Sequence, residues 1–294
     1  MRVLLAASFV DDLEVRWRFA WIGYRMRLYG MRKFQAQKDL HRPETGRSFS
    51  VQFHLLGRVP FDEFLAFQRR LVYEASGQDD GRITVLLCEH PALITVGRTG
   101  SRRHIRLTSR QLRERRLEVR WVSRGGGCIL HGPGQISVYP IVPLRWHGWT
   151  VGEYLRRLRW ALIQTMDQLA VRHEIKGRPA GIWGRSGQLA AWGVAVRNWV
   201  TSHGAYVNVN PVMTQYPFVD VIDPDGTERG EKSTMGCLLA ERRQAVTSPG
   251  VRARLIPLLA AALGTEQYHL ITGHWLLGRR SSEESRHYAA AGQP

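Results

Sequence analysis

The residues best suited to chemistry lie in one glycine-rich segment, residues 124–140, with the sequence RGGGCILHGPGQISVYP. Its five glycines surround Cys128 and His131. Because glycine adopts backbone conformations closed to other residues, such a loop brings the main chain close to a ligand and points N–H groups at it. It lacks the Gly-Lys-Ser/Thr ending of a P-loop and the GxGxxG spacing of a dinucleotide site. We predict a ligand-binding loop of another kind, the alternative being a tight turn with an incidental glycine run.

Cysteine chemistry leaves two interpretations of the loop. Cys128 is a nucleophile with the nearby His131 imidazole as its base, or it is a small apolar filler. The other two cysteines, Cys88 in an expected buried strand and Cys237, are predicted to be structural. Three scattered cysteines suit neither a disulfide scaffold nor a zinc site, so we expect no metal, no cofactor and a reducing cytoplasm.

Composition sets the class of protein. The chain has 294 residues, 44% of them hydrophobic and 23% charged, which suits a globular protein with a sizeable core rather than a disordered or fibrous one. A formal charge of +17 points to an acidic partner, whether nucleic acid, an anionic membrane surface or an acidic protein. The longest apolar stretches, such as 255–263, are far shorter than the roughly 20 residues that span a bilayer, so no transmembrane helix is expected.

Hydrophobic periodicity predicts an α+β domain in which helices cover a mixed sheet. Capping-box spacing marks two helix starts, Thr108 with Gln111 and Thr150 with Glu153. The helix after Thr150 carries a long apolar stripe that we assign to the core. A further helix is expected at 61–75, and strands are expected at 83–87, 93–96, 117–121, 189–196 and 205–209. In the strand 117–121, Leu117, Val119 and Trp121 are expected to face inward.

Three regions divide the chain. Residues 1–50 contain ten Lys/Arg, five Asp/Glu and several aromatics, and are predicted to be a basic extension without a fold of its own. It is either a loosely ordered segment, with Met26 or Met31 as a later start, or an arm for nucleic acid or a membrane surface. Residues 51–278 form the domain, and residues 279–294 are predicted to be a disordered tail.

Four motifs together resemble the octanoyltransferases, also called lipoate-protein ligase B, which have the biotin/lipoate ligase fold. The resemblance covers residues 51–263 and lies in the order and spacing of the motifs. They are CEHPALITVGR at 88–98, the glycine-rich segment at 124–140, GQLAAWG at 187–193 and HGAYVNVN at 203–210.

The resemblance implies an acyltransferase of lipoate biosynthesis. Such an enzyme moves an octanoyl group from octanoyl-acyl carrier protein to a lysine of the lipoyl domains of 2-oxoacid dehydrogenase or glycine cleavage proteins. The reaction passes through a cysteine thioester assisted by a lysine, and both protein substrates are acidic. The implied substrate-binding residues are Arg124, Gly125, Gly126, Gly127, Cys128, Ile129, Leu130, His131, Ala191, Trp192, Gly193, Gly204, Ala205 and Tyr206.

The sequence departs from the family at both catalytic positions. Gln188 stands where the family has its lysine and Asp225 where it has its cysteine. An amide transfers no proton near neutral pH, and a carboxylate is a poor nucleophile toward a thioester. Ile129 also replaces the usual loop threonine. The family mechanism therefore cannot run unchanged.

Three explanations remain open at this point. The nucleophile has moved to Cys128, the chain is an ATP-dependent lipoate ligase, or it is a pseudoenzyme that binds an acyl group or its carrier protein without turnover. The ligases carry a similar three-glycine loop but also need a lysine at the Gln188 position. Nucleic-acid binding through the basic arm explains none of the four motifs, so nucleic acid is not the expected partner.

Overall fold

The computed structural model describes residues 49–177, 180–221, 234–242 and 245–277. The predicted N-terminal extension and C-terminal tail lie outside these ranges except for residues 49 and 50, and so stay predictions. Asp225 also lies outside them. None of the helices in these ranges combines the length and the hydrophobicity that a bilayer-spanning helix requires.

One large mixed sheet organises the domain, with strand order β11-β1-β2-β6-β10-β9-β8-β7. Strand β1 pairs in parallel with β11 and β2, whereas the other pairs are antiparallel. These strands are β1 Val51–Arg58, β2 Ile83–Glu89, β6 Gln135–Ile141, β7 Glu174–Gly177, β8 Ala180–Gly184, β9 Gly187–Arg197, β10 Val200–Asn208 and β11 His269–Thr272.

A second, three-stranded sheet has the order β4-β3-β5 and carries the glycine-rich segment. Its strands are β3 Leu93–Val96, β4 Glu118–Trp121 and β5 Cys128–His131. Three of the five glycines, residues 125–127, fall between β4 and β5 and form the loop that joins the two outer strands of this sheet, whereas Gly132 and Gly134 lie between β5 and β6.

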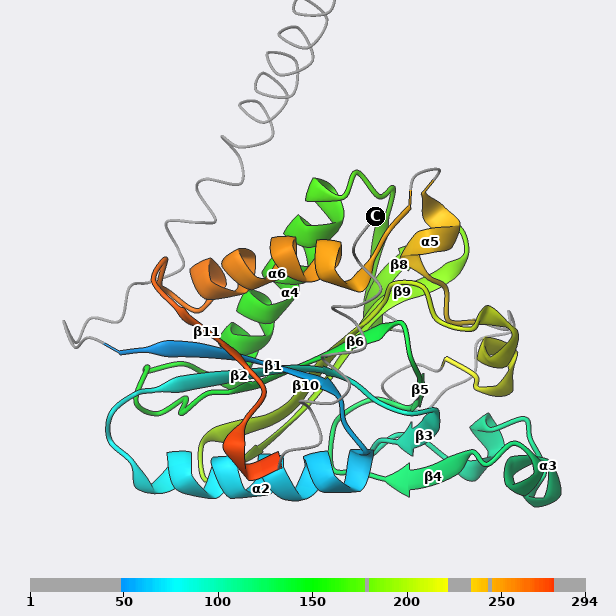
Figure 1. Cartoon of the computed structure of the whole chain (residues 1–294), viewed down its shortest axis with the longest axis horizontal. Coiled ribbons are helices and arrows are strands. Elements are labelled where there is room, and N and C mark those ends of the chain that lie inside the picture. The colour runs from blue at the N-terminus through cyan, green and yellow to red at the C-terminus, as the bar shows by residue number, and fades with distance from the viewer. Residues whose placement is uncertain (1–48, 178–179, 222–233, 243–244, 278–294) are drawn as a thin grey trace, which may run out of the picture. The chain divides into compact units, whose positions relative to one another are not determined.

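Helices cover both faces of the large sheet, with α2 on one side and α4 and α6 on the other (Figure 1). This confirms the predicted α+β class with a helix-covered mixed sheet. The helices are α2 Phe61–Gly77, α3 Ser109–Glu114, α4 Val151–Gln168, α5 Leu238–Glu241 and α6 Ser248–Ala262, and the 3-10 helices are η1 Arg102–His104, η2 Met213–Phe218 and η3 Trp275–Leu277.

The predicted helix starts agree with the structure. The Thr108 side chain accepts from the Gln111 backbone N–H, and the Gln111 side chain accepts from the Thr108 N–H, which completes the capping box. Thr150 caps α4 by accepting from the Glu153 N–H at 3.1 Å. These caps satisfy N–H groups that the first helical turn leaves unpaired.

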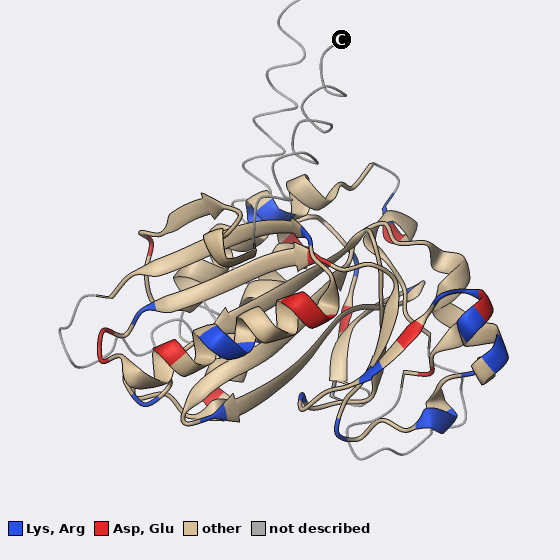
Figure 2. Ribbon diagram, turned by 60° about the horizontal axis from the view of Figure 1, so that its bottom comes forward, with Lys and Arg blue, Asp and Glu red and all other residues tan. Residues whose placement is uncertain are grey.

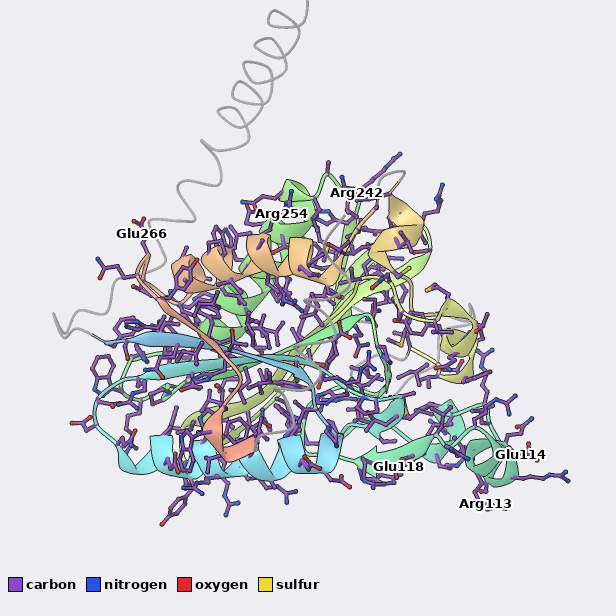
Figure 3. The ribbon with its side chains drawn as sticks, in the orientation of Figure 1. Arg113, Glu114, Glu118, Arg242, Arg254 and Glu266 are labelled. Atoms are coloured by element: carbon purple, nitrogen blue, oxygen red, sulfur yellow. The ribbon has the colours of Figure 1, made fainter. Side chains whose placement is uncertain are left out.

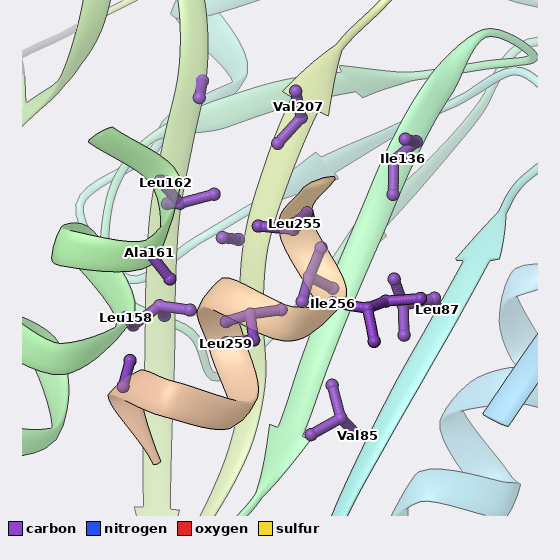
Figure 4. Packing of buried hydrophobic residues seen from close by; sticks show 14 of the residues in the cluster. Val85, Leu87, Ile136, Leu158, Ala161, Leu162, Val207, Leu255, Ile256 and Leu259 are labelled. Atoms are coloured by element: carbon purple, nitrogen blue, oxygen red, sulfur yellow. The ribbon is translucent and has the colours of Figure 1, made fainter. Parts of the chain in front are cut away.

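Two apolar layers form on the two faces of the large sheet. In the layer shown in Figure 4, α4 contributes Leu158, Ala161 and Leu162, and α6 contributes Leu255, Ile256 and Leu259. They pack on sheet residues such as Val85, Leu87, Ile136 and Val207. The other layer packs α2 and the small sheet against the opposite face. Residues from β2, β6 and β10 therefore belong to the core on both faces.

One strand prediction was wrong in its detail. Strand β4 forms where expected, and Leu117 is buried just before it. Trp121, however, is 64% exposed and Val119 only half-buried. Strand β4 is an edge strand of the small sheet and has a neighbouring strand on one side only. Its apolar side chains are therefore covered less completely than those of a central strand.

Candidate functional site

The glycine loop lies between the small sheet and the large one and is hydrogen-bonded to both. The N–H of Gly97 donates to Gly127 O and the N–H of Arg98 to Arg124 O, each at 3.0 Å. On the other side, the N–H of Gly125 donates to Val194 O of β9 at 3.0 Å. The loop is thus a bridge between the two sheets.

Two glycines are required by this geometry. Gly126 has φ of 82°, a left-handed conformation that side-chain-bearing residues rarely adopt. Gly193 on β9 lies so close to the loop that a β-carbon there would come within 2.4 Å of Gly125 O. The close approach of strand and loop therefore depends on the missing side chain at residue 193.

A cavity of about 450 Å³ opens beside the loop. Three segments distant in sequence meet there: the loop, strand β9 and the first turns of α4. The lining residues are Arg98, Arg124, Gly125, Gly126, Gly127, Cys128, Ile129, Val151, Leu155, Ala180, Gln188, Ala191, Trp192, Gly193, Val194, Ala195, Val196 and Val221. Most are apolar or present only backbone, which suits an apolar chain with one polar group.

Backbone donors in the loop are available to such a polar group. Within the described ranges, the N–H groups of Gly126 and Gly127 donate to no protein acceptor. Both residues are half-buried and line the cavity. Two adjacent free N–H groups can hold a carbonyl oxygen and stabilise negative charge that develops on it.

Arg124 supports the loop from beneath. Its side chain is 1% exposed, and its guanidinium donates to the carbonyls of Gly125 and Thr95, each at 3.0 Å, and to the Thr95 hydroxyl at 2.8 Å. Among the described residues no carboxylate pairs with it. The guanidinium therefore adds positive charge below the free loop N–H groups.

His131 continues this network toward β9. Its Nε2 lies 2.8 Å from the Thr95 hydroxyl and its Nδ1 lies 2.8 Å from Gln135 Oε1. Because Arg124 already donates to the Thr95 oxygen, the hydroxyl hydrogen is available for Nε2, and we assign the proton of the neutral ring to Nδ1. Burial lowers the pKa of His131 well below its ordinary value.

Two amides complete the network. Gln135 Nε2 donates to Asn208 Oδ1 at 2.9 Å, and Asn208 Nδ2 donates to the backbone carbonyl of Gln188 at 2.9 Å. We call the five side chains of Arg124, Thr95, His131, Gln135 and Asn208 the loop network. It joins the glycine loop to the strand position where the resemblance placed a catalytic lysine.

The structure does not join Cys128 and His131 as nucleophile and base. They stand three positions apart in β5, so their side chains point to opposite faces of the strand. Both nitrogens of His131 are engaged elsewhere, and the Cys128 thiol lies 3.6 Å from Ser101 O. Burial raises the pKa of the Cys128 thiol to about 11, which keeps it protonated at neutral pH.

The other two cysteines are buried in the fold. Cys88 lies in β2, where burial raises its pKa well above the ordinary value, and its sulfur is 3.5 Å from His90 Nε2. Cys237 is buried at the start of α5. Neither lines the cavity. In the described part of the chain, no three His, Cys, Asp or Glu side chains are grouped to hold a metal ion.

Gln188 lines the cavity at the start of β9. Its side chain is 5% exposed, and its amide donates to Ala180 O at 3.1 Å. A neutral amide that donates to a carbonyl holds strand β8 to β9 but provides no proton shuttle. Asp225, the other substituted catalytic position, lies outside the described residues.

The predicted contact segments divide into three groups. Residues 124–129 and 191–193 line the cavity, whereas Leu130 and His131 line a second cavity of about 480 Å³. Gly204, Ala205 and Tyr206 line neither, although Gly204 pairs with Gly193 across the ladder. They lie behind the site, where the Tyr206 ring packs 5.7 Å from the Arg124 guanidinium carbon.

Sequence reasoning missed several lining residues. Val151 and Leu155 belong to the apolar stripe of α4 that we assigned wholly to the core, yet both line the cavity. Val151, the first residue of α4, is 37% exposed. Arg98, at the end of a quoted motif, also lines the cavity and was not singled out.

Comparison with known proteins identifies the family of this catalytic-domain fold. Residues 61–256 match the model of the lipoyl protein ligase A/B catalytic domain. The structure superposes on lipoate-protein ligase A bound with ATP with a TM-score of 0.60 at 13% identity, covering 81% of this chain and 93% of the other. Superposition on a bipartite lipoate protein ligase from Thermoplasma acidophilum gives a TM-score of 0.59 at 12% sequence identity, covering 82% of this chain and 92% of the other. Likeness at such low identity shows the fold alone.

Sequence relatives narrow the assignment. The octanoyltransferase of Roseiflexus sp. (strain RS-1) is 33% identical over 231 residues, covering 77% of this chain and 93% of the relative. That of Geotalea uraniireducens (strain Rf4) is 36% identical over 161 residues, covering 55% and 72%. The chain has the lipoyl protein ligase A/B catalytic domain, and within that class it belongs to the octanoyltransferase family. This confirms the resemblance seen in the four motifs.

Proposed function

We propose that this protein binds an octanoyl or lipoyl chain in the cavity beside the glycine loop and serves lipoyl-group transfer between octanoyl-acyl carrier protein and lipoyl domains. One observation carries the proposal: the loop, the Gln188–Val196 stretch of β9 and the first turns of α4 converge on one largely apolar cavity with two free backbone N–H groups. The apolar lining takes the acyl chain, and the N–H groups of Gly126 and Gly127 take its carbonyl oxygen.

Catalysis is the part of the proposal that departs from the family. With Gln188 and Asp225 at the dyad positions, the chain lacks the lysine and the cysteine of the thioester mechanism. Oriented binding with backbone donors leaves only residual rate acceleration when a nucleophile is missing. We therefore expect a weak or inactive transferase that retains acyl and carrier binding.

A non-catalytic acyl or acyl-carrier binding protein is the second candidate, and the state of Cys128 favours it. A thiol with a pKa of about 11 and no base beside it is a poor nucleophile. An ATP-dependent ligase is the third candidate, but its lysine is missing at Gln188 as well.

Intact-protein mass spectrometry after incubation with octanoyl-acyl carrier protein separates these candidates. We expect no octanoyl adduct, together with measurable binding of the octanoyl carrier. A hydroxylamine-labile adduct that disappears in Cys128→Ser would instead identify Cys128 as a relocated nucleophile. The absence of both adduct and binding would refute the proposed function altogether. Adenylate formation from octanoate and ATP, followed as pyrophosphate release, would identify a ligase.

A further inference from the structure

A dense group of arginines lies beside the cavity on the segment that contains η1 and α3. Residues 101–116 carry seven arginines and a single acidic residue, Glu114. All seven arginine side chains are exposed. We call them the arginine surface: Arg102, Arg103, Arg106, Arg110, Arg113, Arg115 and Arg116. Figure 2 shows the basic positions gathered at this end of the domain.

The fold holds these arginines in place against their mutual repulsion. Ser101 caps η1 and Thr108 caps α3, and both capping boxes are complete. Ile105, Leu107 and Leu112 are buried beneath the segment and anchor it to the domain. Because like charges close together destabilise a folded state, an ordered cluster of this kind indicates a binding role more than a structural one.

Neighbouring carboxylates neutralise only part of this charge. Arg106 pairs with Asp220, and Arg110 pairs with Glu114 at 2.8 Å. Among the described residues, Arg113 and Arg116 pair with no carboxylate. Figure 3 shows Arg113 and Glu114 projecting outward from α3.

Two short stretches of chain connect the arginine surface to the wall of the cavity. On one side, the N–H of Thr99 donates to the loop carbonyl of Gly126 at 3.3 Å, and Ser101 O lies beside the Cys128 thiol. On the other side, the N–H of Arg106 donates to Phe218 O at 2.9 Å, three residues before Val221, which lines the cavity. A partner bound to the arginines therefore lies next to the cavity without covering it.

We propose that the arginine surface is the docking site of the acidic carrier protein that delivers the acyl group on a flexible arm. This inference rests on the proposed function, because the cavity must accept the acyl chain. The segment from Gly97 to Ser101 separates the arginines from the cavity. A long prosthetic arm bridges such a gap, whereas the short side chain of an acceptor lysine requires its domain to sit over the cavity mouth.

The same surface fits a nucleic acid less well. Residues 101–116 contain no Phe, Tyr or Trp, and their one histidine, His104, is buried. The neighbouring Phe218 ring is already packed against the Arg115 guanidinium, 5.3 Å from its carbon, so the segment presents no exposed ring of its own on which bases could stack. Its charge is also concentrated on a six-residue helix and one 3-10 turn rather than along an extended groove. Complementary charge at the edge of a binding site steers a protein partner and sets its orientation.

Charge reversal within the full-length chain tests the docking site. The test variant is Arg113→Glu with Arg116→Glu. The matched control is Arg252→Glu with Arg254→Glu on α6, a helix that Figure 3 shows far from α3. The probe is acyl carrier protein that carries octanoyl through an inert amide, titrated by calorimetry at low and high salt. We expect roughly tenfold weaker binding in the test variant and no change in the control.

Graded substitutions separate charge from folding. Arg113→Gln with Arg116→Gln should fall between the native chain and the double Glu variant, and Glu114→Gln should tighten binding because it removes the only acidic side chain of the segment. Thermal unfolding of every variant checks that the fold is retained. High salt should reduce the differences among the variants.

The outcomes distinguish the docking site from the proposed function. Octanoyl-pantetheine, which lacks the carrier protein, should bind the native chain and the test variant equally. Failure of the native chain to bind it overturns the proposed function. Equal carrier affinity in test variant and control, or no carrier binding by the native chain, overturns the docking site. The docking site is also overturned if the test variant loses affinity only for a lipoyl domain, or only for a random-sequence oligonucleotide, and keeps its affinity for the carrier protein.

Discussion

The side-chain amide of Asn208 donates a hydrogen bond of 2.9 Å to the backbone carbonyl of Gln188. Through Gln135 and His131, the same amide is connected to the glycine loop. The strand position that carries a lysine in the implied mechanism and the loop that binds the ligand are therefore held by one buried network. A change at either end alters the position of the other.

Replacing Asn208 should disrupt this connection. Asn208→Ala leaves one of the two N–H bonds of the buried Gln135 amide unpaired, since the other donates to Leu130 O at 3.0 Å. It also removes one of the two donors to the Gln188 carbonyl, which keeps the Gly236 N–H at 2.9 Å. A buried donor left unpaired costs about 1–3 kcal/mol. We expect the free energy of unfolding to fall by that amount in urea denaturation and the affinity for octanoyl-pantetheine to fall with it. Gln78→Ala, at an exposed amide, is the control. Equal stability of the two variants would contradict the network.

Gly193 should be intolerant of even one methyl group. A β-carbon at this position would meet Gly125 O at 2.4 Å, so Gly193→Ala must push the loop away from β9. We expect a loss of about 1–3 kcal/mol of stability and clearly weaker acyl binding. Gly132→Ala is the matched control, because no atom lies within 4 Å of its added β-carbon. A thermal midpoint for Gly193→Ala as high as that of the control would refute the close contact.

Cys128 should resist alkylation in the folded protein. With a pKa of about 11, roughly one thiol in a thousand is ionised at pH 8, and only the thiolate reacts. Iodoacetamide labelling followed by peptide mass spectrometry should modify Cys128 quickly in urea and very slowly without it. Rapid labelling of the native chain would show an activated thiol and favour Cys128 as the nucleophile.

Acid should destabilise the domain between about pH 6.5 and pH 4. Burial lowers the pKa of His90 and of His203 to about 4, below the ordinary value of 6.5. The unfolded chain therefore binds more protons in this window, and the stability present above pH 6.5 falls as the pH falls. Each histidine contributes a slope of up to about 1.4 kcal/mol per pH unit. Urea denaturation at several pH values measures it, and constant stability from pH 6.5 to 4.5 would contradict these shifts.

Restoring the dyad should create or raise acyl transfer. Gln188 already lines the cavity, so Gln188→Lys places an amine there, and Asp225→Cys supplies the thiol that the resemblance requires. We expect the double variant to acquire an octanoyl adduct from octanoyl-acyl carrier protein, detected by intact mass. Each single variant serves as a control and should form little or none. A folded, ligand-binding double variant without an adduct would show that the dyad is wrongly mapped.

Local features of the fold could be predicted from the sequence. Helix caps at Thr108 and Thr150, helix α2 and strands β2 and β3 follow from side-chain types and spacing within a few residues of one another. The opposite faces of Cys128 and His131 also follow from their odd spacing once residues 128–131 are known to be a strand. The sequence interpretation treated that stretch only as a loop, and so it kept the two as a possible pair.

The sequence by itself determined the family, the glycine loop and the substitutions at positions 188 and 225, because these are properties of residue type and order. Only the tertiary structure decided which residues meet. Strand β10 lies between β6 and β9, so residues 204–206 fall behind the cavity, while the first turns of α4 reach its wall. Contacts between distant segments depend on sheet order and helix placement, which no local pattern encodes. The loop network arises in the same way, because its five side chains come from four separate strands and the glycine loop, which only folding brings together.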